Sequence, residues 1–325
     1  MQTRQLGQSG FAVSEVGLGC WQLGGDFGPI NEVTANELLQ TAVDCGIDFW
    51  DTANVYGNGQ SEAWIGKFLT LTGYSVRVAT KYGRGPDAFP DRYSLTGMRD
   101  SVRQSLDRLR RDRIDLLQLH CVPTEILKRG EIFDWLRQLQ DEQLIEHFGA
   151  SVESVEEGLI CLQQPGLLSL QVIFNLFRQK LVDELLPQAA ERGVGIIARL
   201  PLASGLLAGR WTPETTFPPE DHRNYNRDGE HFNVGETFAG IPLDVGIGLA
   251  EQAKRIAAGR PLAEVALRWI LDHPAVSTII PGARRPDQVK ANAAISNLTP
   301  LDDSLHRSLR DFYNAEVRRH IRGPY

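Results

Sequence analysis

The chain has few cysteines, no long hydrophobic run and no excess of positive charge. Its four cysteines are widely spaced and form no Cys-x-x-Cys or Cys/His cluster, so we expect free thiols and no metal site. No segment approaches the roughly 18 consecutive apolar residues of a transmembrane helix. The polar segment Met1–Gly10 also lacks the apolar core of a signal peptide. We therefore expect a cytoplasmic protein with no membrane partner.

The charge balance excludes a further class of partner. The chain has 34 Lys and Arg residues against 41 Asp and Glu residues, which gives a formal net charge of −7. Nucleic-acid-binding domains usually carry a basic patch, and none is evident here. The arginine-rich stretch Arg99–Arg113 contains interleaved aspartates, which is typical of a solvated helix face. We expect no nucleic-acid partner.

The chain does contain a repeated alternation of short apolar runs and amphipathic helical stretches. The apolar runs predict eight strands, at Val16–Cys20, Ile47–Asp51, Val76–Lys81, Ile114–His120, His147–Ala150, Ser169–Phe174, Gly195–Leu200 and Val276–Pro281. Strands that alternate with helices form a parallel sheet. Eight such units predict either a closed (β/α)8 barrel or a large doubly wound sheet.

The first predicted strand distinguishes these two folds. A dinucleotide-binding doubly wound sheet should show Gly-x-Gly-x-x-Gly there, whereas this strand runs into GLGCWQLGG at Gly17–Gly25. We therefore predict an α/β protein with a (β/α)8 TIM barrel, as a single domain over residues 1–325. The segment Thr3–Val16, with turn signals at Gly7 and Ser9-Gly10, predicts a β-hairpin that closes the barrel floor.

One connection is out of proportion to the others. Trp211–Pro242 has no sustained periodicity but contains several aromatic residues, so we expect an ordered loop. It follows the seventh strand, on the side of a barrel where active sites lie. We expect this loop to influence substrate choice. By position, Trp21, Tyr82 and Val122 should form other parts of the pocket wall.

Polar residues stand at the ends of consecutive predicted strands. Asp51 ends the second strand with Tyr56 just beyond it, Lys81 ends the third, and His120 ends the fourth. A free tyrosine has a pKa of about 10, and a nearby ammonium group lowers it. We therefore predict that Tyr56 donates a proton to a carbonyl oxygen, with Lys81 lowering its pKa and Asp51 keeping Lys81 charged. His120 would orient the substrate carbonyl.

These motifs, in their order, resemble those of the aldo-keto reductase family. They are GLGCWQLGG, DFWDTANVYGNGQSEAWIGK, VATKYG, DLLQLH, FGAS, LQVIFNLF, RLPLASGLLAGR and IIPGARRPDQVKANAA, and together they cover nearly the whole chain. The resemblance implies an oxidoreductase that reduces an aldehyde or ketone with NADPH and needs no metal. It also implies a catalytic tetrad with Tyr56 as general acid, completed by Asp51, Lys81 and His120.

The resemblance also implies where the cofactor binds. Ser151 and Gln171 would hold the nicotinamide carboxamide, and Arg199 stands where many relatives stack an aromatic ring on the nicotinamide. The other implied contacts are Pro201, Leu202, Ser204 and Arg210 near the pyrophosphate, and Gly282, Arg284, Gln288 and Asn292 at the adenosine end.

Three features depart from the commonest family pattern. Val152 replaces the asparagine that often follows the serine, which removes one carboxamide contact. At Arg199 the aromatic ring is replaced by a guanidinium group, which can also stack. Arg284 and Arg285 stand in for the lysine–serine pair that some relatives use at the 2′-phosphate. Because arginine suits phosphate binding, we expect NADPH rather than NADH.

A second function class fits the same residues. The family includes barrels that act mainly as partners of a membrane channel, so an NADPH-binding regulatory subunit with slow or no turnover is the alternative. A third option is a non-redox reaction, such as a dehydration, at the same site. Small aldehydes, sugars and quinone-like carbonyls are all compatible substrates. The sequence is compatible with a monomer or a homo-oligomer.

Overall fold

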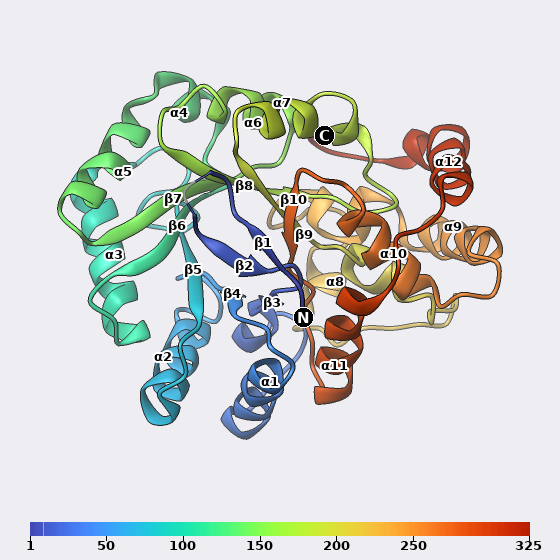
Figure 1. The fold of residues 1–325 in the computed structure, drawn as a ribbon, viewed down its shortest axis with the longest axis horizontal. Helices are drawn as coiled ribbons and strands as arrows, with labels where there is room; N and C mark the ends of the chain where they lie inside the picture. The colour runs from blue at the N-terminus through green and yellow to red at the C-terminus, as the bar shows by residue number, and fades with distance from the viewer. Residues whose placement is uncertain (9) are drawn as a thin grey trace.

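Eight parallel strands form the centre of the part of the chain that the computed structural model describes, residues 1–8 and 10–325 (Figure 1). In sheet order they are β3 Leu18–Gly19, β4 Phe49–Asp51, β5 Arg77–Tyr82, β6 Ile114–His120, β7 Ile145–Ser151, β8 Leu167–Ile173, β9 Gly195–Arg199 and β10 Val276–Ile279. Parallel bridges between Val16 and Ile279 and between Gly19 and Gly282 join the first strand to the last. The sheet therefore closes on itself, and the predicted (β/α)8 barrel is confirmed.

Helices surround the barrel and connect its strands (Figure 1). They are α1 Glu32–Asp44, α2 Gln60–Thr72, α3 Leu95–Leu109, α4 Thr124–Arg129, α5 Glu131–Asp141, α6 Val155–Cys161, α7 Leu185–Glu191, α8 His222–Tyr225, α9 Leu243–Ile256, α10 Leu262–Leu271, α11 Pro286–Ala294 and α12 Asp303–Phe312. Several begin at a side-chain cap, as where Asn31 accepts a hydrogen bond from the backbone of Thr34. Among the described residues, no helix has the length and apolar character needed to cross a bilayer.

The N-terminal hairpin closes one end of the barrel. Strands β1 Thr3–Gln5 and β2 Ala12–Ser14 pair antiparallel and lie across the face seen in Figure 1. Leu6, Phe11 and Val13 of this segment share an apolar cluster with residues inside the barrel. The predicted floor hairpin is therefore confirmed. Of its predicted turn signals, Ser9 lies outside the described residues.

Alternation along the strands stacks two layers of side chains inside the barrel. The lower layer is apolar and includes Phe49, Ala79, Leu116 and Ile197. Two residues further along the same four strands stand Asp51, Lys81, Gln118 and Arg199. Because alternate residues of a strand point to the same side, this second, polar layer lies above the first. It sits at the carboxyl ends of the strands, where barrel active sites form.

The long connection after β9 is packed rather than extended. It contains α8 and three short 3₁₀ segments, at Ala203–Ala208, Val234–Glu236 and Phe238–Gly240. The rings of Trp211, Phe217 and Phe238 contact one another, with centroids 5.1 to 5.8 Å apart. The aromatic residues noted in the sequence thus form the core of an ordered loop.

Candidate active site

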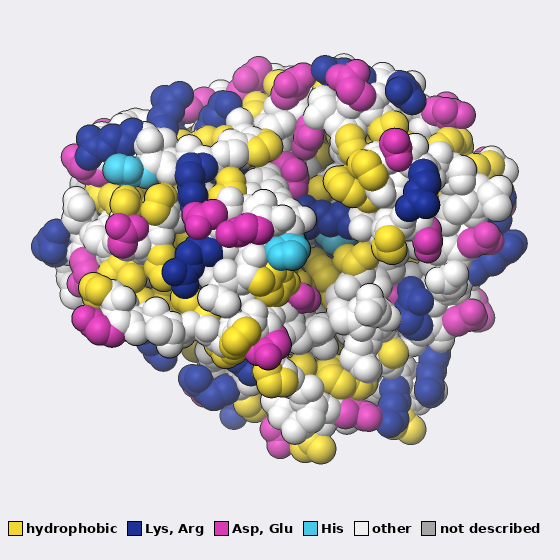
Figure 2. Space-filling view, turned by 180° about the vertical axis from the view of Figure 1, so that it is seen from behind, with side chains coloured by type: hydrophobic (Ala, Val, Ile, Leu, Met, Phe, Trp, Pro, Cys, Tyr) yellow, Lys and Arg dark blue, Asp and Glu magenta, His cyan; other side chains and the backbone are white. Residues whose placement is uncertain are grey.

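A cavity of about 520 Å³ lies at the carboxyl ends of the strands. Figure 2 shows the molecule from behind, and the hollow near the middle of this face contains hydrophobic, His and Lys or Arg side chains. The cavity is lined by Tyr56 and His120 at one part and by Gly282 and Gln288 at another. The candidate catalytic and adenosine-end residues therefore share one continuous space.

The structure brings the four predicted catalytic residues together. The Nζ atom of Lys81 lies 2.5 Å from Asp51 Oδ1 and donates hydrogen bonds to Thr52 O at 2.7 Å and to the Tyr56 hydroxyl at 3.2 Å. The rings of Tyr56 and His120 lie with centroids 6.0 Å apart and planes at 86°. The side chains of Asp51 and Lys81 are buried, so their ion pair is shielded from water.

Burial sets the pKa of Tyr56. Removal from water raises the pKa of its hydroxyl above the ordinary value, and the Lys81 ammonium offsets only part of that rise. Lys81 therefore lowers the pKa of Tyr56, as the sequence predicts, but burial outweighs it and the net shift is upward. A raised pKa keeps the hydroxyl protonated at neutral pH, which is the form that can donate a proton.

The pKa values of Lys81 and His120 are shifted in opposite directions. Burial alone lowers the pKa of Lys81, but Asp51 and Tyr56 outweigh it and the pKa is raised, so the ammonium stays charged. Burial lowers the pKa of His120 well below its usual range, and the charges of Arg84, Lys81 and Arg199 add to this shift. His120 is therefore a neutral imidazole at neutral pH.

Gln118 is part of this group although it was not singled out in the sequence. Its Nε2 donates to Asp51 Oδ2 at 2.9 Å, and Gln171 Nε2 donates to the same oxygen at 2.7 Å. Gln171 also accepts from Ser151 Oγ at 3.4 Å, so the predicted carboxamide pair lies together. A signal for Gln118 was available: it stands two residues before His120 in a largely apolar strand, which places both on the interior side.

Most of the expected cofactor contacts line the cavity. They are Gln171, Arg199, Pro201, Leu202, Ser204, Gly282, Arg284 and Gln288. Ser151 lies behind Gln171, whereas Arg210 is exposed and Asn292 is buried in α11 without lining the cavity. The lining also includes Gln22 Oε1 and Arg199 Nε, two buried polar atoms without a hydrogen-bond partner among the described residues. A cavity that reaches from the candidate catalytic residues to Gln288 and contains free polar atoms fits a dinucleotide.

The two arginines considered for the 2′-phosphate differ in their partners. Arg284 donates from Nη1 to Phe27 O at 2.6 Å and from Nη2 to Pro29 O at 3.1 Å. Arg285 instead forms an exposed ion pair with Asp287 at 2.8 Å. Neutral carbonyls leave the charge of Arg284 uncompensated, whereas the charge of Arg285 is offset. Arg284 is therefore the better phosphate candidate of the two.

The predicted pocket wall is correct in part. Trp21 lines the cavity and stacks on Tyr56, with centroids 5.9 Å apart. Tyr82 and Val122 pack in the main hydrophobic core instead and do not line the cavity. For Tyr82 the reason is alternation, because its neighbour Lys81 points inward. Phe232 from the long loop completes the aromatic part of the wall.

A second charged group lies beside His120. Glu236 accepts a hydrogen bond from Arg84 Nη1 at 3.0 Å and lies 3.1 Å from Arg199 Nη1. The other Nη atom of Arg84 lies 2.7 Å from Glu153. We call Arg84, Glu153, Arg199 and Glu236 the arginine–glutamate network. Only Arg199 was expected at the site. The aperiodic loop that carries Glu236 offers no pattern that would single this residue out.

Comparisons with known proteins agree with this geometry. A family model described as "Aldo/keto reductase family" matches residues 15–314. The aldo-keto reductase YhdN of Bacillus subtilis (strain 168) is 29% identical over 304 residues, covering 92% of this chain and 90% of that protein. A protein named "Probable voltage-gated potassium channel subunit beta", from Oryza sativa subsp. japonica, is 30% identical over 325 residues, with 93% of each chain covered. The solved holo form of aldo-keto reductase AKR11C1 from Bacillus halodurans is similar with a TM-score of 0.78 and 29% identity, covering 96% of each chain.

Proposed function

The chain belongs to the aldo/keto reductase family, and we propose that it reduces an aldehyde or ketone to the alcohol with NADPH as its cofactor. The observation that carries this proposal is the single cavity that reaches both Tyr56 and Arg284. When bound, the reduced nicotinamide supplies the two electrons and the hydrogen that the carbonyl carbon receives. The chain's own residues would bind, orient and protonate the substrate.

Tyr56 is the proposed general acid. Its raised pKa keeps the proton on the hydroxyl until the carbonyl oxygen takes it. Lys81, 3.2 Å away, would then stabilise the phenolate that remains. His120 lines the same cavity as a neutral imidazole and would hydrogen-bond the carbonyl oxygen. The proton thus moves from a buried hydroxyl to the substrate without passing through bulk water.

The proposed cofactor site follows the cavity. Ser151 and Gln171 would hold the carboxamide, and Arg199 would stack on the nicotinamide ring. Pro201, Leu202 and Ser204 would border the pyrophosphate, with Gly282 and Gln288 at the adenosine. Arg284 would bind the 2′-phosphate, because a guanidinium held by neutral carbonyls keeps its full charge for an anion.

The first experiment measures aldehyde-dependent oxidation of NADPH with a panel of aromatic and aliphatic aldehydes. We expect Tyr56→Phe to lower kcat by about 10²- to 10⁴-fold, the usual contribution of a general acid, while NADPH affinity is retained. Tyr74→Phe is the matched control, because Tyr74 is exposed and lies outside the cavity. Near-normal turnover by Tyr56→Phe would remove Tyr56 from this role.

The cofactor preference has its own test. We expect Arg284→Met to weaken NADPH binding by about tenfold or more and to leave NADH binding nearly unchanged, because only NADPH carries the 2′-phosphate. Arg285→Met is the control, since Arg285 is paired with Asp287. Equal losses for both cofactors would contradict the assignment of Arg284 to the phosphate.

A regulatory role is the second candidate, favoured by the similarity to a protein named as a potassium channel subunit. It predicts saturable NADPH binding without turnover of any aldehyde in the panel. The same absorbance assay therefore separates the two functions.

A further inference from the structure

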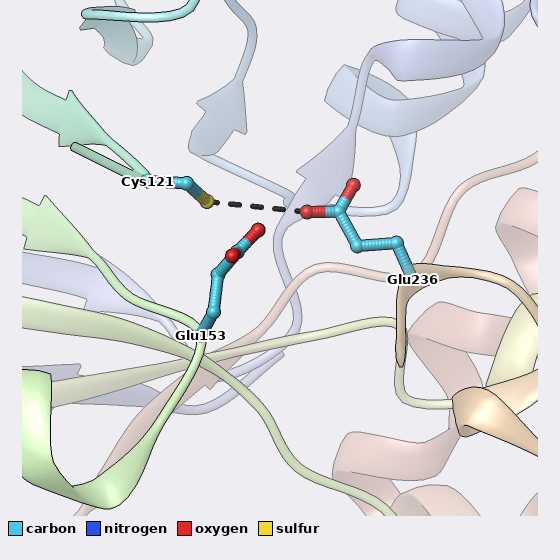
Figure 3. Close-up of side chains that lie close together, drawn as sticks. All are labelled: Cys121, Glu153 and Glu236. Carbon is cyan, nitrogen blue, oxygen red and sulfur yellow. Dashed lines mark hydrogen bonds between the residues drawn. The ribbon is translucent and has the colours of Figure 1, made fainter. Parts of the chain in front are cut away.

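Glu236 reaches the cavity from the long loop and meets groups from four other segments, namely Arg84, Cys121, Glu153 and Arg199. Figure 3 shows its carboxylate turned toward the carboxylate of Glu153 and the thiol of Cys121, with Cys121 Sγ 3.9 Å from Glu236 Oε1. Three potential metal ligands thus lie within 4.8 Å of one another. Both carboxylates are ion-paired with guanidinium groups, however, so the cluster is already neutralised.

The arginine–glutamate network contains two positive and two negative groups. Burial alone raises the pKa of Glu236, but Arg84 and Arg199 outweigh it and lower the pKa, so this carboxylate is ionised at neutral pH. Within residues 1–8 and 10–325, Arg199 has no other carboxylate partner, and its further hydrogen bonds go to Val152 O at 3.4 Å and Cys121 Sγ at 3.6 Å. Glu236 is therefore the group that offsets the charge of Arg199.

We propose that Glu236 is a positioning residue that holds the Arg199 guanidinium at the nicotinamide site and compensates its charge, so that the site accepts the oxidised cofactor as well as the reduced one. This inference rests on the cofactor placement proposed above. The oxidised nicotinamide ring carries a positive charge and the reduced ring is neutral. An uncompensated guanidinium beside the ring therefore disfavours the oxidised form alone.

The proposal predicts effects of opposite sign for the two partners. Glu236→Gln leaves the network with one net positive charge, so NADP⁺ should bind more weakly relative to NADPH. Arg199→Met leaves one net negative charge, so NADP⁺ should bind more tightly relative to NADPH. The double variant restores neutrality, and its ratio should return close to that of the unmodified chain. Loss of packing alone would not reverse the sign between the two single variants.

The experiment is calorimetric titration of the intact protein with NADPH and with NADP⁺ at pH 8, without any substrate. For Glu236→Gln we expect the ratio of the two dissociation constants, NADP⁺ over NADPH, to rise by about tenfold or more. For Arg199→Met we expect it to fall. Glu230→Gln is the matched control, because Glu230 lies on the same loop, is exposed, and accepts a hydrogen bond from the backbone of Asp228.

The outcomes separate this inference from the proposed function. If neither cofactor binds the unmodified chain, the proposed function itself fails. If both bind but Glu236→Gln weakens them equally, Glu236 is a structural anchor only and the inference is overturned. Should Glu236→Gln fail to fold, Arg199→Met still tests the sign, because Glu236 keeps its bonds to Arg84 in that variant.

Discussion

Two ionic groups lie close to His120, one buried and the other partly buried, and the chain builds them in different ways. The Asp51–Lys81 pair joins neighbouring strands, β4 and β5, and its partners are 30 residues apart. The arginine–glutamate network instead joins strand ends to the long loop, and Glu236 is 152 residues from Arg84. The lowered pKa of His120 reflects burial and then the positive charges of both groups.

The difference concerns what keeps each group in place. The pairing of β4 with β5 positions Asp51 and Lys81, so this pair is present whenever the barrel is folded. Glu236 depends instead on the packing of the long loop, and loops generally open at a lower free energy than the strands of a core. The first group therefore suits a fixed chemical role, and the second suits a contact that can change with the state of the cofactor.

The largest effect is expected when the positive charge of the Asp51–Lys81 pair is removed. We expect Lys81→Met to lower the free energy of unfolding by about 3 to 5 kcal/mol, because it leaves the Asp51 carboxylate buried without a cation. Denaturation in urea measures this. Lys67→Met is the control: its exposed pair with Glu32 should contribute about 1 kcal/mol or less. Equal effects of the two variants would contradict the special role of burial.

Disruption of the arginine–glutamate network should affect the long loop and not the barrel. In Glu236→Gln we expect backbone amides of residues 222–240 to exchange with solvent about tenfold faster or more, while amides of β4 to β9 keep their protection. Hydrogen exchange followed by mass spectrometry resolves the two regions. Uniform acceleration over the whole barrel would mean that the network supports the fold and not only the loop.

Acid should protonate Glu236 and so have the same effect on stability as Glu236→Gln. The network lowers the pKa of Glu236 to about 2, against an ordinary glutamate near about 4.3. The stabilisation is therefore complete above the ordinary pKa and is lost as the pH falls toward the lowered one. We expect the difference in Tm between the unmodified chain and Glu236→Gln to shrink below about pH 4.3. A difference that stays constant down to about pH 3 would oppose this.

The smallest expected effect concerns the pH dependence of kcat, which should be nearly absent. Because the pKa of Tyr56 is raised and that of His120 is lowered, neither should titrate between about pH 6.5 and 10. The kcat of carbonyl reduction should be nearly constant across that range. A fall in kcat with rising pH, centred at about pH 6.5, would show that His120 loses a proton that the reaction requires.

The difference between contacts within neighbouring strands and contacts between distant segments also explains what the sequence could predict. Asp51, Lys81 and His120 end apolar runs, and parallel strands bring such ends to one side, so these residues were found from local patterns. Gln118 follows the same rule but was overlooked. The hairpin floor was also accessible, because its turn signals and short apolar runs are local.

The rest depends on contacts between distant segments. No periodicity relates Glu236 to Arg84 or Arg199, so the network could not be read from the chain. The lowering effect of Lys81 on the pKa of Tyr56 could be predicted, because its charge is visible in a sequence, but the larger and opposite effect of burial could not. Tyr82 was placed in the pocket by proximity along the chain, although alternation turns it toward the helices.

The reactivity of the Cys121 thiol can report on the contact between the long loop and the barrel. The thiol is buried against Ser151 and Glu236, and burial raises its pKa to about 12, so almost no reactive thiolate is present. Lifting the loop removes Glu236 from above the sulfur and admits water and reagents. Because alkylation of a thiol by iodoacetamide is slow relative to loop motion, its rate at Cys121 should follow the fraction of molecules with an open loop, with the less buried Cys45 as an internal reference. Cys121 would thus serve as a native label for the population of molecules in which the site is open.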